Sequence, residues 1–154
     1  MTLSDGTAYR IRSIRPEDKE MLASGLEMLT PESRYKRFLA AKPRLSSREL
    51  RYLTEVDFAD HHAVLAVTWE QPERLVGVGR WVRSTVNPEE AEIAVVIGDP
   101  AQGQGVGTEI CKALADYAAA RGIRRFTAES LPSNKAAHRL LDASNERLRG
   151  LDEP

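Results

Sequence analysis

The sequence predicts a mixed fold of helices and strands, of the α/β or α+β class, with a central sheet. Apolar segments of strand length alternate with segments whose apolar residues recur at helical spacing. Two strands near the middle of the chain are separated by a short turn, so they should form an antiparallel hairpin. Residues 91–129 follow as a strand–helix–strand unit, which should cross over right-handedly and place its two strands parallel.

Length and composition are those of an ordinary globular domain. The chain has 154 residues, 42% hydrophobic and 29% charged, so we expect one domain over residues 1–154. A net charge of −1 provides no overall field that would attract nucleic acid or anionic membranes. No apolar run is long enough to span a bilayer, and residues 1–7 lack the features of a signal peptide. We therefore expect a cytoplasmic protein with no nucleic-acid or membrane partner.

The first third of the chain predicts one strand and three short helices. Residues 9–14 alternate as a strand should, and the proline that opens residues 16–29 suits the first turn of a helix. A second helix is expected over residues 30–39. Ser46 and Glu49 have the spacing of a capping box, which predicts the start of a third helix.

The remaining elements alternate between strands and helices after an initial run of three strands. Turn residues separate the three strands, and Gly122 follows the central helix as a C-terminal cap should. The expected elements are strands over 62–69, 75–82 and 91–97, a helix from 106 to about 118, a strand over 123–129 and a helix from 133 to about 148.

A glycine-rich loop between the strand over 91–97 and the following helix is the most informative segment. Gly103, Gly105 and Gly107 leave backbone N–H groups unshielded where the helix begins. Such a terminus holds an anion through its free donors and its positive dipole end. A dinucleotide-binding or nucleoside-triphosphate-binding loop fits poorly, because the loop follows a hairpin and contains no lysine. On residue types alone, a structural turn with no ligand stays open.

The loop also carries a resemblance to a known family. Residues 102–107 match the Gln/Arg-x-x-Gly-x-Gly/Ala signature of the GNAT superfamily of N-acetyltransferases, and the chain resembles that superfamily over about residues 9–141. Softer motifs are similar to those of the bacterial Pat-type protein lysine acetyltransferases. These motifs lie at residues 11–18, 30–38, 53–57 and 91–96. The resemblance implies the mixed sheet of that superfamily and an N-acetyltransferase that uses acetyl-CoA and a protein lysine or a small amine.

The resemblance further implies where acetyl-CoA binds. The pantetheine arm would pair like an extra strand with the strand over 91–97, and the backbone N–H groups of the loop would bind the diphosphate. Asn134 matches an asparagine that faces the pantetheine arm, although it also suits a helix cap. The implied binding residues are Val95, Val96, Ile97, Gln102, Gly103, Gln104, Gly105, Val106, Gly107, Thr108 and Asn134.

Acyl transfer to an amine requires a group that removes a proton. At pH 7 only about one lysine in 2,500 is unprotonated, so a carboxylate must collect the proton directly or through water. Glu92 matches the general base of Pat-type enzymes; the alternatives are a glutamate that faces solvent or one paired with Arg80. A backbone N–H near Val95 would polarise the thioester carbonyl. Many relatives carry a tyrosine acid in the last helix, at the position of Leu141 here, so water would protonate the leaving thiolate.

The histidines and the single cysteine do not predict a metal site. His61 and His62 are neighbours on an expected strand and should point to opposite faces of the sheet, and His138 lies far along the chain. The lone Cys111 excludes an internal disulfide and a site built from several cysteines. We expect no metal cofactor.

The chain departs from its relatives near the C-terminus. Asn145 and Glu146 stand where relatives have Gly-Phe, and residues 147–154 are too short and polar for the two further strands of the relatives. The strand over 123–129 would then have an unpaired edge. Exposed edges recruit partners, so a homodimer is one hypothesis. Loss of those strands also leaves open a regulatory module that binds acyl-CoA without catalysis.

Overall fold

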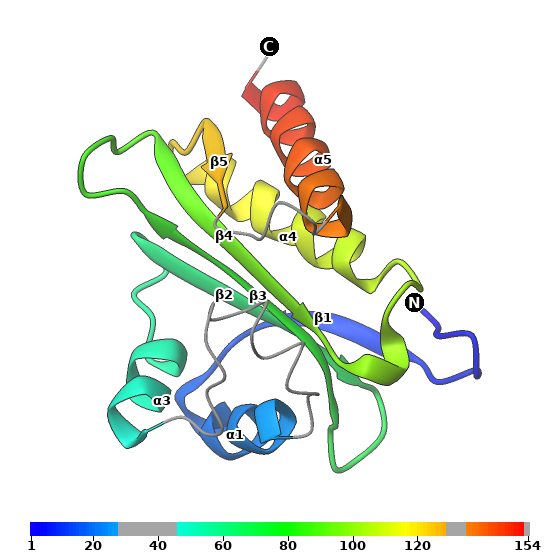
Figure 1. Ribbon diagram of the computed structural model, residues 1–154. Helices are drawn as coiled ribbons and strands as arrows, with labels where there is room; N and C mark the ends of the chain where they lie inside the picture. The colour runs from blue at the N-terminus through cyan, green and yellow to red at the C-terminus, as the bar shows by residue number, and fades with distance from the viewer. Residues whose placement is uncertain (28–45, 129–134, 153–154) are drawn as a thin grey trace.

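The computed structural model describes residues 1–27, 46–128 and 135–152, which form a five-stranded sheet with helices on both faces (Figure 1). The strands, in spatial order, are β1 Tyr9–Ser13, β2 His61–Thr68, β3 Leu75–Arg83, β4 Glu90–Ile97 and β5 Arg125–Thr127. The helices are η1 Pro16–Asp18, α1 Lys19–Glu27, α3 Ser47–Thr54, η2 Asp99–Ala101, α4 Val106–Ala120 and α5 Lys135–Asp152.

The strand pairing confirms the predicted mixed sheet. The pairs β1–β2, β2–β3 and β3–β4 are antiparallel, and β5 is parallel to β4. The predicted hairpin consists of β2 and β3, and the predicted crossover consists of β4, α4 and β5. The helix predicted over 30–39 lies outside the described residues.

Each face of the sheet carries its own apolar cluster. Val64 and Trp81 belong to the cluster under α4 and α5, whereas Leu65 belongs to the cluster under α1 and α3. A β-carbon at Gly79 would lie 2.3 Å from Cγ2 of Ile110, so the glycine lets α4 pack directly on β3. This close packing fixes the start of α4 relative to the neighbouring strand β4.

Local signals set several of the boundaries. The capping box is formed as predicted, because Ser46 Oγ accepts the Glu49 N–H at 3.1 Å and the Glu49 carboxylate accepts the Ser46 N–H at 3.0 Å. Gly122 has a φ of +81° and follows α4 as expected. The Ile123 N–H still donates to the Ala118 carbonyl at the end of α4. Strand β5 therefore begins two residues later than the predicted start at residue 123.

No strand pairs with the outer edge of β5 in the described residues, as the sequence predicts, but the expectation that this edge is open is wrong. Asn145, on α5, accepts the N–H of Phe126 at 2.7 Å and donates to the carbonyl of Phe126 at 3.1 Å. A side chain of the last helix therefore occupies the two backbone groups that an additional strand would use. The expectation failed because the sequence does not show that the asparagine at the point of departure from the relatives turns toward β5.

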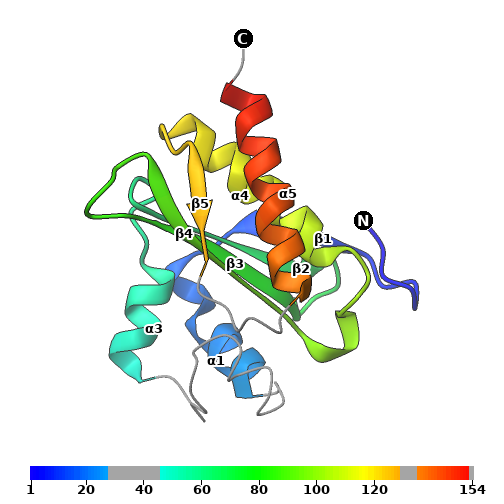
Figure 2. The same ribbon diagram turned by 45° about the horizontal axis from the view of Figure 1, so that its top comes forward.

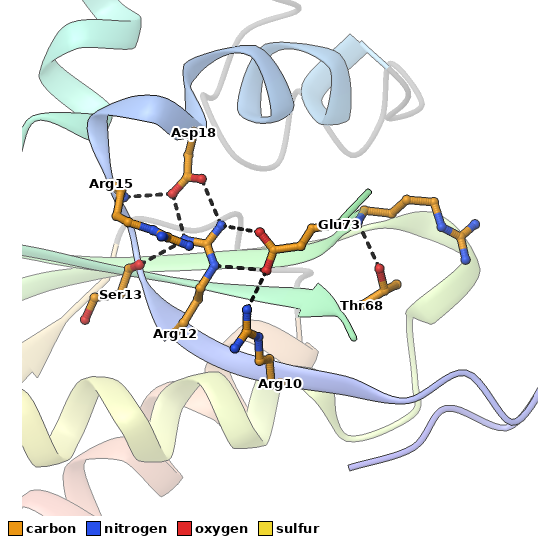
Figure 3. A network of polar contacts seen from close by, with 8 residues as sticks. Arg10, Arg12, Ser13, Arg15, Asp18, Thr68 and Glu73 are labelled. Atoms are coloured by element: carbon orange, nitrogen blue, oxygen red, sulfur yellow. Dashed lines mark hydrogen bonds and ion pairs between the residues drawn. The ribbon is translucent and has the colours of Figure 1, made fainter. Parts of the chain in front are cut away.

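A partly buried ion-pair network connects β1 to the α1 side of the sheet (Figure 3). The Arg12 guanidinium donates to both carboxylate oxygens of Asp18, at 2.8 and 2.9 Å, and also to Glu73 at 2.9 Å. Arg10 donates to Glu73 at 3.0 Å, and its guanidinium lies 4.6 Å from the ring centroid of Trp69. The network holds β1, the last residue of η1 and the turn between β2 and β3 together.

The network lowers the pKa values of its carboxylates and raises that of Arg12. Hydrogen bonds from Arg12 lower the pKa of Glu73 to about 2. Burial alone would raise the pKa of Asp18, but hydrogen bonds from Arg12 and from the Arg15 backbone N–H outweigh it and lower this pKa. The hydrogen bond to Asp18 raises the pKa of Arg12. All three side chains therefore stay charged near neutral pH.

Glu73→Gln should lower the free energy of unfolding strongly at pH 7 and by less at pH 3. The Glu73 pKa is about 2 in the folded chain against an ordinary value of 4.5, so the carboxylate stabilises the fold above pH 4.5. That contribution is lost as the pH falls toward 2, because the unfolded chain then binds the proton first. Urea unfolding at both pH values measures the effect, with the exposed Glu70→Gln as control. An equal destabilisation by Glu73→Gln at the two pH values would contradict the account.

Candidate functional site

A cleft of about 600 Å³ lies between β4, the start of α4 and α5. Strand β4 contributes residues 93–97, and the loop and first turn of α4 contribute a set of small or polar residues. Helix α5 and Ala128, just after β5, form the opposite wall. The cleft therefore joins the glycine loop to the second half of β4, two segments that the sequence analysis assigns to one ligand.

The cleft exists because β5 pairs with only the first part of β4. The two strands pair from Glu90 with Arg125 to Glu92 with Thr127, and β4 then continues to Ile97. Over residues 93–97 the side of β4 that faces away from β3 has no strand beside it in the described part of the chain (Figure 2). An open strand edge offers hydrogen-bonding groups to an extended ligand.

The hydrogen bonds at both ends of β4 show which backbone groups line this open edge. Glu90 accepts a bond from Ser84 and Gly98 donates one to Val76, so even-numbered residues direct their backbone groups toward β3. Glu89 instead accepts the N–H of Arg125 on the β5 side. Because the direction alternates along a strand, the backbone groups of residues 95 and 97 point to the open edge. A ligand with amide groups can pair there.

The head of α4 carries backbone donors that no side chain caps. Gly105 is the N-terminal cap residue, with a φ of +85°, and it makes no side-chain capping bond. Gly103 also has a positive φ of +76°, and nothing lies within 4 Å of a β-carbon built on either glycine. The first N–H groups of the helix and its positive dipole end therefore lie against the cleft with no capping side chain from the described residues, as an anion site requires.

Both glutamines of the loop bond to its backbone. Gln102 lines the cleft and donates to the Ile97 carbonyl at 3.2 Å. Gln104 donates to the Pro100 carbonyl at 2.9 Å and accepts the Ser4 N–H at 2.8 Å. Gln104 is not part of the cleft wall, so its contacts shape the loop from outside.

Most of the predicted binding residues lie together in the cleft. Those that line it are Val95, Val96, Ile97, Gln102, Gly103, Gly105, Gly107 and Thr108. Val106 is buried in the core under α4 and, like Gln104, does not line the cleft. Asn134 lies outside the described residues. Leu141, which stands at the position of the tyrosine acid of many relatives, does line it.

The wall formed by α5 contains residues that sequence reasoning missed. The side chains of Ala136, Ala137 and Ala143 are small, so this wall projects little into the cleft. Arg139 is the one charged side chain among the described residues that line the cleft. Arg139 is exposed and makes no hydrogen bond or ion pair within the described part of the chain. The spacing of the alanines and of Leu140 along the helix is a signal that could have identified this face.

Glu92 lies one residue before the cleft, on the other face of the sheet. It pairs with Val82, which points away from α4 because Gly79 and Trp81 point toward it. Its carboxylate is exposed, and no hydrogen bond or ion pair to it is found in the described residues. The alternative pairing with Arg80 is not formed, since Arg80 donates to the Leu53 carbonyl and contacts His61.

The neighbouring histidines point to opposite faces, as predicted. The His61 ring lies 5.0 Å from the ring of Tyr52 on α3, whereas the His62 ring stacks at 3.9 Å on Tyr117 of α4. Burial lowers the pKa of His62 to about 4, so this imidazole is neutral at pH 7. Within the described ranges, no three His, Cys, Asp or Glu side chains are grouped as a metal ion would require. None of the described helices is long and apolar enough to span a membrane.

Comparisons with known proteins agree with this geometry. The chain is 33% identical over 141 residues to "Acetyltransferase Pat" of Mycolicibacterium smegmatis. The aligned region covers 89% of the chain but only 40% of that protein. It is 31% identical to "Acetyltransferase PA5475" of Pseudomonas aeruginosa, over 88% of the chain and 73% of that protein. The crystal structure of the GNAT domain of S. lividans PAT matches with a TM-score of 0.81 and 35% identity, over 93% of this chain and 84% of that one.

The family assignment rests on most of the chain. The family model for the acetyltransferase (GNAT) domain matches residues 9–144, from the first strand to the last helix. The match contains both the glycine loop and β4, the segments that meet in the cleft. The chain therefore belongs to the GNAT family of acetyltransferases.

Proposed function

We propose that the chain transfers the acetyl group of acetyl-CoA to a primary amine, and that this amine is a lysine side chain of a protein. One observation carries the proposal: the cleft combines an open strand edge with uncapped helix donors and an arginine that has no ion-pair partner among the described residues. The lysine acceptor is supported by the similarity to a protein named Pat acetyltransferase, although the chain spans only part of that protein.

The chemistry of the cleft suits coenzyme A. The diphosphate binds at the N–H groups of residues 103–108, because two negative charges there meet several oriented donors. The pantetheine arm, which contains amide groups, pairs with the open edge at residues 95 and 97. Arg139 binds a further phosphate oxygen at the α5 wall. Small residues on α5 leave room for the arm between this helix and β4.

Glu92 acts as the general base in the transfer. It accepts a proton from the lysine ammonium, and the amine nitrogen then attacks the thioester carbonyl carbon. A C–N bond forms and the C–S bond breaks. The second proton that the nitrogen loses passes through water to the leaving thiolate, and Glu92 then releases its own proton to solvent. The Val95 N–H, at the open edge, donates to the carbonyl oxygen as negative charge develops. The exposure of Glu92 and the absence of an ion pair to it from the described residues support this role.

Glu92→Gln should lower kcat by about 10²–10⁴-fold at pH 7 and leave the affinity for acetyl-CoA unchanged. The difference in kcat between Glu92→Gln and the wild type should become smaller at higher pH, since more of the acceptor amine is then unprotonated. Steady-state kinetics with a lysine peptide and calorimetry with acetyl-CoA measure the two quantities. Glu90→Gln, at the start of the same strand and ion-paired with Arg125, is the matched control. A variant as fast as the wild type would remove Glu92 as the base.

Arg139→Ala should weaken CoA binding by about tenfold, because a charge-assisted hydrogen bond to a phosphate is lost. Arg149→Ala, on an exposed position of the same helix away from the cleft, should bind CoA as the wild type does. Calorimetric titration with CoA measures both. Equal affinities of the two variants would show that Arg139 does not contact the ligand.

Mass spectrometry identifies the acceptor class. Proteins, lysine peptides and small diamines are each incubated with the chain and acetyl-CoA, and acetylated products are mapped. We expect acetyl-lysine in the proteins and peptides. Acetylation of small amines alone would contradict the protein acceptor, and tight CoA binding without any product would indicate a regulatory module.

A further inference from the structure

The side chain of Asn145 replaces a strand at the outer edge of β5. The Phe126 N–H and carbonyl point away from β4, since Arg125 directs its own N–H to Glu89 on the β4 side. Both Phe126 groups are bonded to the Asn145 amide, which accepts from one and donates to the other as a peptide group of a neighbouring strand would. Figure 2 shows α5 beside β5 at this edge.

This contact lies at the wall of the cleft. Ala143 and Ser144, directly before Asn145, line the cleft, and so does Ala128, two residues after Phe126. Two other contacts hold α5 to α4 instead: Leu140 packs near Gly107, and Arg147 bonds to both carboxylate oxygens of Asp116, at 3.0 and 3.2 Å. Asn145 therefore joins the helix to the sheet at the point where the cleft opens.

We propose that Asn145 is a positioning residue that sets the width of the slot for the pantetheine arm. The inference rests on the proposed function. The slot runs between the open edge of β4 and the wall made by Ala128 and α5. Because β4 and β5 pair over only three residues each, that pairing by itself leaves the outer wall weakly fixed. Phe126 and Leu148 pack together in the core on the inner side of the wall, and the two bonds from Asn145 fix its outer backbone edge.

Removal of the Asn145 amide leaves the Phe126 N–H and carbonyl without partners. Phe126 is 1% exposed, so these groups regain water only if β5 and α5 separate or shift. Either movement changes the distance between the outer wall and β4. The head of α4 is held separately by its packing on β3, so the diphosphate site does not move with β5. The loss of binding affinity is therefore confined to the contacts of the pantetheine arm.

The test compares two ligands that share a diphosphate. CoA carries the pantetheine arm, whereas ADP does not. In Asn145→Ala and Asn145→Asp we expect the affinity for CoA to fall about tenfold, while the affinity for ADP stays that of the wild type. Asp keeps the shape of Asn but cannot donate to the Phe126 carbonyl. Glu146→Ala, at the next and exposed position, is the matched control and should bind both ligands as the wild type does.

The ratio of the CoA affinity to the ADP affinity distinguishes a positioning role of Asn145 from a purely stabilising one. If Asn145 only stabilises the fold, its variants unfold at lower temperature but bind both ligands normally, which would overturn the proposal. Equal loss of CoA and ADP binding would overturn it as well. A wild-type chain that binds neither ligand would refute the proposed function instead, and this inference with it.

Hydrogen exchange on the wild-type chain tests the same proposal without a variant. The Phe126 N–H bonded to Asn145 should exchange slowly, and CoA should slow it further because the arm holds the slot closed. ADP should not change this rate, since it does not reach the slot. An exchange rate of Phe126 that CoA leaves unchanged would contradict the proposal.

Discussion

The uncapped head of α4 beside the open edge of β4 is the feature on which the rest of the account depends. Backbone donors at a helix start attract negative charge only if the helix end is held still and kept clear of side chains. Gly79 supplies the first condition, because its missing β-carbon lets Ile110 lie against β3. Gly103 and Gly105 supply the second, since both adopt a positive φ and project nothing into the cleft.

Strand β4 also divides the chemistry between the two faces of the sheet. The cleft lies on its open edge and toward α4 and α5, whereas Glu92 points to the α1 and α3 side. In the proposed reaction, the acceptor would approach from the face that carries Glu92, the acyl donor would lie in the cleft, and the reacting atoms would meet at β4. The proposed role of Glu92 agrees with the absence of an ion pair to it in the described residues, because a base must be accessible to the substrate.

Features that depend on neighbouring residues could be predicted from the sequence. The Ser46–Glu49 capping box, the hairpin of β2 and β3 and the parallel crossover around α4 all formed as expected. Features that depend on distant residues could not. Arg12 and Glu73 are 61 positions apart, and an asparagine within a helix gives no sign that it will bond to a strand 19 residues earlier. Arg139 was missed because helical spacing can indicate a face of α5 but does not show that this face lines a cleft with β4.

The most direct test of the central claim is a nuclear magnetic resonance titration of the amide groups in the glycine loop. The account predicts that the amide resonances of Gly103, Gly105 and Gly107 shift when either CoA or ADP is added, because the diphosphate binds their N–H groups. Pantetheine, which has no diphosphate, should leave them in place. Binding of CoA with these three resonances unmoved would contradict the account.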